Sequence, residues 1–463
     1  MTHWKATFPG FFGSALIVAS LTSLVYFWDV GKWPWDHDEV SGLVEVGASQ
    51  LHVAGAPAAQ LSRIRLAVPV WYVAQRTALS FLPPNEWGSR LLSACCAVGI
   101  VIVLFIVGWT RGGAGLAYAS TLVTGLSQPL IVVGQNNRFY AMALFFAMLT
   151  FSRFWAAPAS LWIDLMSVAL LTLLAIFSHN LLVVFFCLCF AASALAYIIG
   201  HADRLLVLRT GVAAAVSVAA YVLYLHFVIG GWASGGLGEA SSLVTVAAAV
   251  GIPTIALALL GIVTGLRNES TRSYTIVLGL LLAGEVVFIG SWRLFLTNWN
   301  AWYAFLFLPP LWLVAAQGVA DVGVALADWR RAGWYICIGL ILLPNFVSYF
   351  RDGSRHDFRK SAAVVADHLR EDERVYANWP SELQYYLNSL KPASVTGWWR
   401  TDPLPASECI IVYASNAFEP VIVPPGRSMK ILGEIFTRRF DEQSYVVRIY
   451  QFGALAPARV QAR

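Results

Sequence analysis

The sequence has 463 residues, of which 58% are hydrophobic and only 12% are charged. Soluble proteins average about 25% charged residues, so the composition excludes a soluble globular protein and indicates a polytopic helical membrane protein. The formal net charge of +5 comes from basic residues scattered between apolar runs, which excludes a nucleic-acid-binding surface. The six cysteines form no disulfide framework and no metal-binding pattern.

Windows of about 20 apolar residues predict membrane-spanning helices along the first three quarters of the chain. Eleven windows qualify, namely residues 9–28, 88–109, 114–133, 138–155, 161–178, 180–199, 210–229, 242–265, 273–291, 301–319 and 332–349. A signal peptide is one interpretation of the first window. No small-residue cleavage site follows it, so we expect an uncleaved anchor instead.

Arginines concentrate in the short loops on one side of the predicted helices. They are Arg111, Arg153, Arg204, Arg209, Arg267, Arg272, Arg330 and Arg331. The positive-inside rule therefore places these loops and the N-terminus in the cytoplasm. An odd number of spans then places the region after residue 350 on the outer side.

The first outer loop, residues 29–87, is an exception because it carries Lys32, Arg63 and Arg65 beside its acids. A charged exception in a protein of low charge indicates a functional site. Residues 40–54 place apolar side chains at helical spacing and predict an amphipathic helix lying on the membrane. Residues 61–82 predict a second interfacial helix, with a partly inserted segment as the alternative.

This loop contains the run Asp36-His37-Asp38-Glu39 directly after the first helix. Carboxylates close to a bilayer pay a desolvation cost, so we expect them to be paired, hydrated or functional. An acid such as Asp38 or Glu39 in this place suits a general base that deprotonates a hydroxyl. Asp36-His37-Asp38 also matches a metal-and-diphosphate motif, but the Rossmann-like domain that this motif requires is not evident. A His/Asp metal site and solvated loop charges remain alternatives.

Two tight polar turns on the outer side join neighbouring spans. The first contains Arg138 and Tyr140, and the planar guanidinium of Arg138 suits a phosphate. The alternative is an arginine whose stem lies along the helix end while its charge reaches water. The second turn contains His179, which is either a ligand or a hydrogen-bonded helix end.

Glu285 lies within an otherwise apolar span, and Arg293 follows two turns later. Acids inside the membrane are candidates for function. A structural ion pair with Arg293 or Arg138 is the alternative.

After about residue 350 the charge rises and the apolar runs shorten. We predict a helix over Phe358–Leu369 and a second one whose capping box is Ser381-Glu382-Leu383-Gln384. Three strands are predicted, at Cys409–Ala414, Met429–Phe436 and Tyr445–Phe452. Residues 351–463 therefore form a small α/β domain, and residues 1–350 form the transmembrane domain.

The chain resembles the integral-membrane GT-C glycosyltransferases, and within them the protein mannosyltransferase and aminoarabinose-transferase-like group (glycosyltransferase family 39 and relatives). Four stretches carry the resemblance in the family's order. They are the aromatic-then-acidic motif Trp35–Glu39, the segment Pro69–Tyr72 with the helix start Glu86–Ala94, the turn Gln135–Ala141, and the histidine turn Phe177–Asn180.

The resemblance implies an all-α polytopic membrane bundle of the GT-C type. It also implies an inverting transfer of a sugar from a polyprenyl-phosphate donor to an extracytoplasmic acceptor. We expect no cofactor and no metal, because transfer from such a donor does not require a metal. Asp38, with Glu39 beside it, is then the base, and Arg138 lies near the lipid phosphate. The other residues that we expect at the substrate site are Asp36, His37, Arg65, Tyr72, Tyr140, His179, Glu285, Arg293 and Tyr303.

Two positions depart from the family pattern. Ala67 and Val68 stand before Pro69 where the family often has a charged residue or histidine and a second proline. Trp302 stands before Tyr303 where many members have arginine. A substrate contact is therefore missing or supplied by another residue such as Arg65 or Arg293.

A transporter or lipid flippase is the alternative function. Transporters show internal repeats and interrupted helices at the midplane. We find no convincing repeat here, and the charged residues collect at the outer surface. We therefore predict a glycosyltransferase of the bacterial inner membrane with its active site on the periplasmic side.

Overall fold

A computed structural model of the chain describes residues 4–35, 39–40, 43, 68–157, 160–228, 247, 250–295, 304–352, 356–399, 402–415, 428–438 and 444–453. The chain forms two compact units. The helical unit comprises Met1–Val30, Arg63–Ala78 and Arg90–Ser348, and the α/β unit comprises Gly31–Ser62, Leu79–Ser89 and Tyr349–Arg463.

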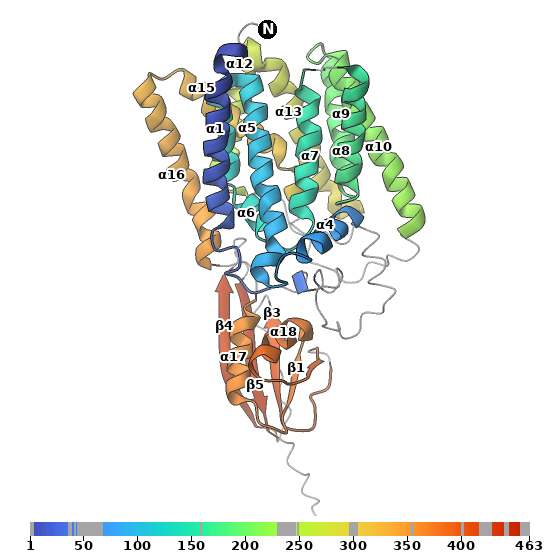
Figure 1. Cartoon of the computed structure of the whole chain (residues 1–463), viewed down its shortest axis with the longest axis vertical. Helices are drawn as coiled ribbons and strands as arrows, with labels where there is room; N and C mark the ends of the chain where they lie inside the picture. Colours follow the sequence, from blue (N-terminus) through green and yellow to red (C-terminus); the bar gives the residue numbers. More distant parts are fainter. Residues whose placement is uncertain are drawn as a thin grey trace, which may run out of the picture. The chain divides into compact units, whose positions relative to one another are not determined.

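The helical unit is a bundle whose long helices run side by side (Figure 1). Its elements are α1 (Trp4–Phe27), α4 (Pro69–Leu79), α5 (Glu86–Gly125), α6 (Gln128–Gly134), α7 (Tyr140–Trp155), α8 (Leu161–Ile176), α9 (Leu182–Ile198), α10 (Arg204–Val228), α12 (Ile252–Arg267), α13 (Glu269–Phe295), η1 (Phe305–Phe307), α15 (Pro309–Val324) and α16 (Asp328–Asp352). The helices are apolar around most of their surface, as expected for helices that are surrounded by lipid or by other helices.

The predicted class of fold, a helical membrane protein with a small sheet, is confirmed in outline. Every predicted apolar window overlaps a described helix. Four described helices are long and apolar enough to cross a membrane, and five shorter ones are apolar over 10–17 residues. The number of eleven crossings stays a prediction.

The long helix α5 is in fact two helices that meet at Gly113, whose φ of 69° only glycine adopts readily. The chain reverses there. The two halves then lie against each other, since a Cβ at Gly108 would be only 2.8 Å from the Cα of Ala117. The rings of Phe105 and Tyr118 also meet across the turn, with centroids 6.1 Å apart. This reversal separates the predicted spans 88–109 and 114–133.

The backbones of helices α12 and α15 approach each other at two glycines more closely than a residue with a side chain would allow. A Cβ at Gly261 would lie 1.8 Å from the carbonyl oxygen of Val314, and one at Gly318 would lie 2.6 Å from that of Leu257. Small residues at such contacts let helix backbones meet in a membrane, where the hydrophobic effect does not drive helices together.

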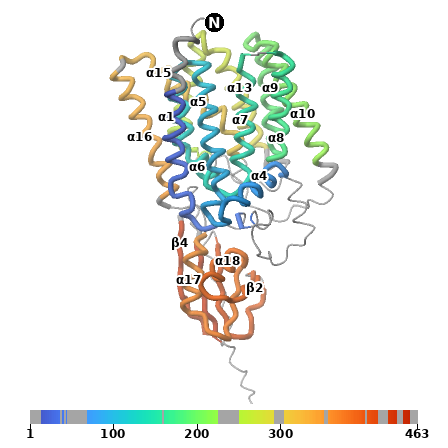
Figure 2. The backbone as a smooth tube through the Cα atoms, viewed as in Figure 1, coloured from blue at the N-terminus to red at the C-terminus, as the bar shows by residue number. Residues whose placement is uncertain are grey.

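The α/β unit contains a five-stranded sheet of order β2-β1-β3-β5-β4 with the helices α17 and α18 (Figures 1 and 2). The strands are β1 (Arg374–Ala377), β2 (Val395–Gly397), β3 (Cys409–Ser415), β4 (Met429–Arg438) and β5 (Ser444–Phe452), and the helices are α17 (Phe358–His368) and α18 (Pro380–Leu390). β2, β1 and β3 are parallel, whereas β3, β5 and β4 are antiparallel.

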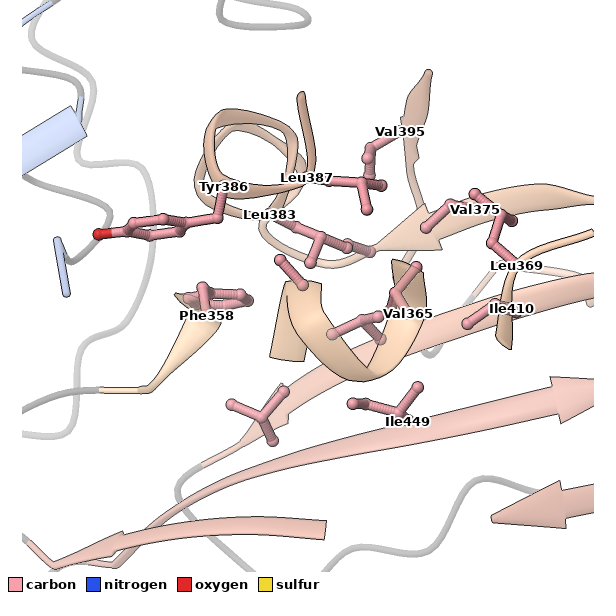
Figure 3. Close-up of a cluster of buried hydrophobic side chains, with 14 of the residues drawn as sticks. Phe358, Val365, Leu369, Val375, Leu383, Tyr386, Leu387, Val395, Ile410 and Ile449 are labelled. Atoms are coloured by element: carbon pink, nitrogen blue, oxygen red, sulfur yellow. The ribbon is translucent and has the colours of Figure 1, made fainter. Parts of the chain in front are cut away.

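Apolar side chains of both helices and of the strands form the core of this unit (Figure 3). Phe358 and Val365 of α17 meet Leu383 and Leu387 of α18 over Ile449 of β5. The three predicted strands and both predicted helices are confirmed, whereas β1 and β2 were not predicted.

The predicted capping box at Ser381 is wrong. Helix α18 begins at Pro380, its N-cap is Trp379, and no side chain caps it by a hydrogen bond. Proline favours the first helical position because it has no N–H group to satisfy there, so the helix starts two residues earlier than predicted. Helix α17 does have a side-chain cap, since the Asp357 carboxylate accepts a hydrogen bond from the Lys360 N–H.

Candidate functional site

Three segments that are far apart in the sequence meet at one end of the helical unit. The Val70 N–H of α4 donates a hydrogen bond to the Phe177 carbonyl at 3.3 Å. The Gln75 amide donates to the Asn137 side chain at 2.8 Å, and the Trp71 ring meets the Phe139 ring edge-on. The interfacial helix predicted in the first outer loop therefore packs on both polar turns.

The first turn is also held by the end of α1 and by α5. The buried Gln135 side chain donates hydrogen bonds to the carbonyls of Tyr26 and Trp28, at 3.2 and 2.9 Å. The Ser93 hydroxyl donates to the Arg138 carbonyl at 3.3 Å. The backbone of the turn that carries Arg138 is thus fixed from two sides.

The guanidinium of Arg138 lies 4.9 Å above the Phe139 ring and is half-buried. Phe139 and Tyr140 also contact the imidazole of His179, with centroids 5.0 and 5.6 Å apart. Three residues that were predicted at the substrate site, Arg138, Tyr140 and His179, therefore lie together. Their roles in binding stay predictions.

His179 is buried, and its Nδ1 accepts a hydrogen bond from the Leu181 N–H at 3.1 Å. Burial, and then the positive charge of Arg138, lower its pKa from 6.5 to about 3. The imidazole is therefore neutral at physiological pH. This geometry is that of a hydrogen-bonded helix end, the alternative that we gave for this residue.

Tyr72 is half-buried on α4, and its hydroxyl accepts a hydrogen bond from the Arg76 guanidinium at 3.2 Å. The side chain of Arg76 is exposed. This second guanidinium lies on the helix that packs against the turn of Arg138.

Glu285 of α13 is 2% exposed, and its Oε1 makes no hydrogen bond with any residue that the structure describes. Arg293 lies near the end of the same helix, in a stretch whose side chains are outside the description. A buried acid within the bundle remains a candidate for function.

The α/β unit contains Trp35, which precedes the acidic run, and Glu39, the last residue of the run. Trp35 is fully buried, with its N–H donating to the Tyr386 hydroxyl at 2.7 Å and its indole N–H donating to Ser89 at 3.3 Å. Its ring packs on Tyr385 at 4.3 Å. Glu39, the last residue of the run, is fully buried, so the alternative of solvated charges does not apply to it.

The carboxylate of Glu86 joins these groups to α17 and α18. It accepts hydrogen bonds from the Tyr386 hydroxyl at 2.9 Å and from the Arg359 guanidinium at 2.6 Å. Burial lowers the pKa of Arg359, but the hydrogen bond and charge of Glu86 outweigh it and raise the pKa above its usual value. The backbone before the acidic run is therefore held by the C-terminal part of the chain.

Several predicted residues lie outside the described part of the chain. They are Asp36, His37, Asp38, Arg65 and Tyr303. Among the residues that are described, no group of His, Cys, Asp and Glu could hold a metal ion. Sequence reasoning missed Gln75 and Asn137, although a glutamine inside an apolar segment and an asparagine in a tight turn both signal a buried polar contact.

No protein-family model matches the chain, and no curated protein sequence matches it. Solved structures do match. ArnT from Cupriavidus metallidurans, an aminoarabinose transferase, aligns in its apo state over 95% of this chain and 98% of its own, with TM-score 0.57 and 12% identity. ArnT bound to undecaprenyl phosphate aligns over 94% and 98%, with TM-score 0.56 and 12% identity.

The Archaeoglobus fulgidus oligosaccharyltransferase in its apo form aligns over 82% of this chain and 64% of its own, with TM-score 0.53 and 11% identity. ArnT and this oligosaccharyltransferase are both GT-C glycosyltransferases. The resemblance of this chain to the GT-C fold is therefore confirmed, over nearly its whole length.

Proposed function

We propose that this protein, which has the fold of the GT-C glycosyltransferases, transfers a sugar from a polyprenyl-phosphate donor to an extracytoplasmic hydroxyl. The observation that carries the proposal is the convergence of Arg138, Tyr140 and His179 with α4 at one end of a membrane bundle. The structural neighbour ArnT has been solved with undecaprenyl phosphate bound, which supports a lipid-phosphate donor.

Asp38 is the general base of the proposed reaction. Its carboxylate takes the proton of the acceptor hydroxyl as the hydroxyl oxygen attacks the anomeric carbon. The bond between this carbon and the phosphate oxygen breaks, the configuration inverts, and polyprenyl phosphate leaves with the bonding electrons. Polyprenyl phosphate, a phosphate monoester, is a good leaving group, so this chemistry does not require a metal.

Arg138 stabilises the charge that develops on the departing phosphate. Its guanidinium offers a planar set of donors that matches phosphate oxygens. The contacts of its backbone with Ser93 and of its side chain with Phe139 hold it in place before substrate binds. The neutral state of His179 leaves Arg138 as the cation of this pair.

The arginine bias places this end of the bundle on the outer face, so we propose the bacterial inner membrane with a periplasmic active site. A lipid-linked donor reaches such a site by lateral diffusion, with its phosphate at headgroup depth. The outer compartment has no pool of nucleotide sugars, which supports a lipid donor.

The experiment supplies each donor separately to purified protein in detergent with a hydroxyl acceptor. We expect transfer from a polyprenyl-phosphate sugar and none from a nucleotide sugar. Asp38→Asn should lower turnover by about two to four orders of magnitude, because it keeps the shape of the side chain but removes a general base.

Asp367→Asn, at an exposed position of α17, is the matched control and should keep full activity. Near-normal transfer by Asp38→Asn would remove Asp38 from this role. Movement of the lipid-linked sugar across vesicles without any transfer would favour a flippase instead.

A further inference from the structure

A cluster of charged side chains lies at the other end of α7 from Arg138. Asp164 of α8 is 1% exposed and is held between two arginines. Its Oδ1 lies 2.5 Å from an Nη of Arg153, and its Oδ2 lies 2.5 Å from the Nε of Arg209. Arg209 also donates a hydrogen bond to the Phe154 carbonyl at 3.0 Å.

Three more side chains complete this cluster. Arg111 donates to the Trp155 carbonyl at 2.8 Å, and its guanidinium lies 5.0 Å above the Trp155 ring. The Tyr274 ring meets the Trp155 ring edge-on, with centroids 4.8 Å apart. Arg111 is also within electrostatic range of Tyr274, Asp203 and Arg209. Five elements, α5, α7, α8, α10 and α13, thus meet around the last residues of α7.

Four buried donor atoms of this cluster make no hydrogen bond with any described residue. They are Nη2 of Arg209, Nε of Arg153, Nε1 of Trp155 and the hydroxyl of Tyr274. Buried polar groups in native proteins are nearly always hydrogen-bonded, because an unmade bond forfeits the hydration of the donor. All four can donate, so the partner that the described residues do not supply is an acceptor.

The charges of the cluster agree with an anionic acceptor. The guanidinium groups of Arg111, Arg153 and Arg209 outnumber the carboxylates of Asp164 and Asp203. Arg209 and Tyr274 are buried, whereas the side chain of Arg153 is 32% exposed and Arg111 is exposed. The side chains of Arg111 and Arg153 therefore bring the edge of the cluster to the protein surface.

We propose that this cluster binds the phosphate group of an anionic ligand, at a site separate from the sugar-transfer site. Arginine forks and the hydroxyl and indole donors match the several oxygens of a phosphate. The 16 residues of α7 span about 24 Å, so the two sites lie at opposite ends of one helix. The predicted topology puts this end at the cytoplasmic leaflet, which is rich in anionic phospholipids. A lipid headgroup and free phosphate share the required chemistry.

The test measures the thermal unfolding midpoint of delipidated protein in detergent while a ligand is titrated. The ligands are short-chain phosphatidylglycerol, short-chain phosphatidylcholine and inorganic phosphate. We expect a saturable rise with phosphatidylglycerol or with inorganic phosphate, since a ligand that binds only the folded state stabilises it. A response to the anionic lipid alone identifies a headgroup, and a response to inorganic phosphate identifies the free ion.

Tyr274→Phe and Trp155→Phe each remove one donor and keep an aromatic ring in place. Each should raise the half-saturating ligand concentration about tenfold, the size of one hydrogen bond to a charged group. Without ligand, Tyr274→Phe should unfold at the same temperature or higher, because it removes a buried donor that has no acceptor. If the hydroxyl had a purely structural role, Tyr274→Phe would unfold at a lower temperature than the unaltered protein.

Two variants serve as controls. Tyr197→Phe changes a half-exposed tyrosine of α9 and should leave the titration unchanged. Arg138→Ala lies at the other end of α7 and should also keep the response. The proposal is overturned if no ligand gives a saturable rise, if Tyr274→Phe and Trp155→Phe both titrate like the unaltered protein, or if Arg138→Ala abolishes the response.

Discussion

Removing the hydroxyl of Tyr386 tests whether the C-terminal α/β fold holds the acidic run in its working position. This hydroxyl accepts the Trp35 N–H at 2.7 Å and donates to the Glu86 carboxylate at 2.9 Å. Tyr386→Phe removes both bonds and leaves the N–H of a fully buried residue without this acceptor. The loss of a buried partner and of a bond to a charged group costs about 2–4 kcal/mol in total.

This cost falls on the segment that leads directly into Asp36, His37 and Asp38. Each 1.36 kcal/mol of barrier is a factor of ten in rate, so if about 2 kcal/mol reaches the transition state, transfer slows about 30-fold. We also expect faster proteolysis after Trp35, because the contact that anchors this residue is weakened.

The assay compares transfer rate and limited proteolysis in Tyr386→Phe and in Tyr385→Phe. Tyr385 packs on the same Trp35 ring and is the neighbour of Tyr386, so the second variant is a matched control. Its ring contact survives the change, and we expect transfer within about threefold of normal. Equal rates and equal protease resistance in the two variants would refute the idea that Tyr386 positions the loop.

Three further predictions concern Arg138, His179 and the membrane topology. Arg138→Ala should weaken use of the lipid donor more than Arg138→Lys, because lysine keeps the charge but not the planar fork. The measurement is KM and kcat for the donor. Equal defects in the two variants would contradict a contact between the forked guanidinium and the phosphate. His179 has a pKa near 3 when folded and about 6.5 when unfolded, so the stability from its burial is complete above pH 6.5 and falls below it, by about 2 kcal/mol at pH 5. The unfolding midpoints at pH 7.5 and pH 5 should differ less in His179→Gln than in the unaltered protein. An equal difference in both would mean that another group causes the loss of stability at low pH. A reporter fused after Arg463 should report an outer location, whereas a cytoplasmic signal would mean that one span was miscounted.

The positions of the helices could be predicted because hydrophobicity is a local property of the sequence. Apolar windows located every long helix, and Gly113 falls in the gap between two of them. The short strands β1 and β2 were missed because four and three residues are too few for an alternating pattern. The helix start at Pro380 was misjudged because the capping pattern at Ser381 competed with the stronger preference of proline for the first turn.

The candidate site was only partly predictable. Arg138 and His179 stood out because they are polar residues in tight turns between apolar runs. The bond between Gln75 and Asn137 joins residues that are 62 positions apart, and no local pattern encodes such a pairing. The same holds for Trp35 and Tyr386, which are 351 positions apart. Both contacts follow from the tertiary fold.

The contact of Gly261 with Val314 and of Gly318 with Leu257 brings the backbones of α12 and α15 together without side chains between them. Two helices can slide past each other when side chains at their contact change rotamers, and at Gly261 and Gly318 there is no side chain to do so. The pair therefore acts mechanically as one rigid element. Any rearrangement of the helical unit during a reaction cycle must take place along other helix contacts.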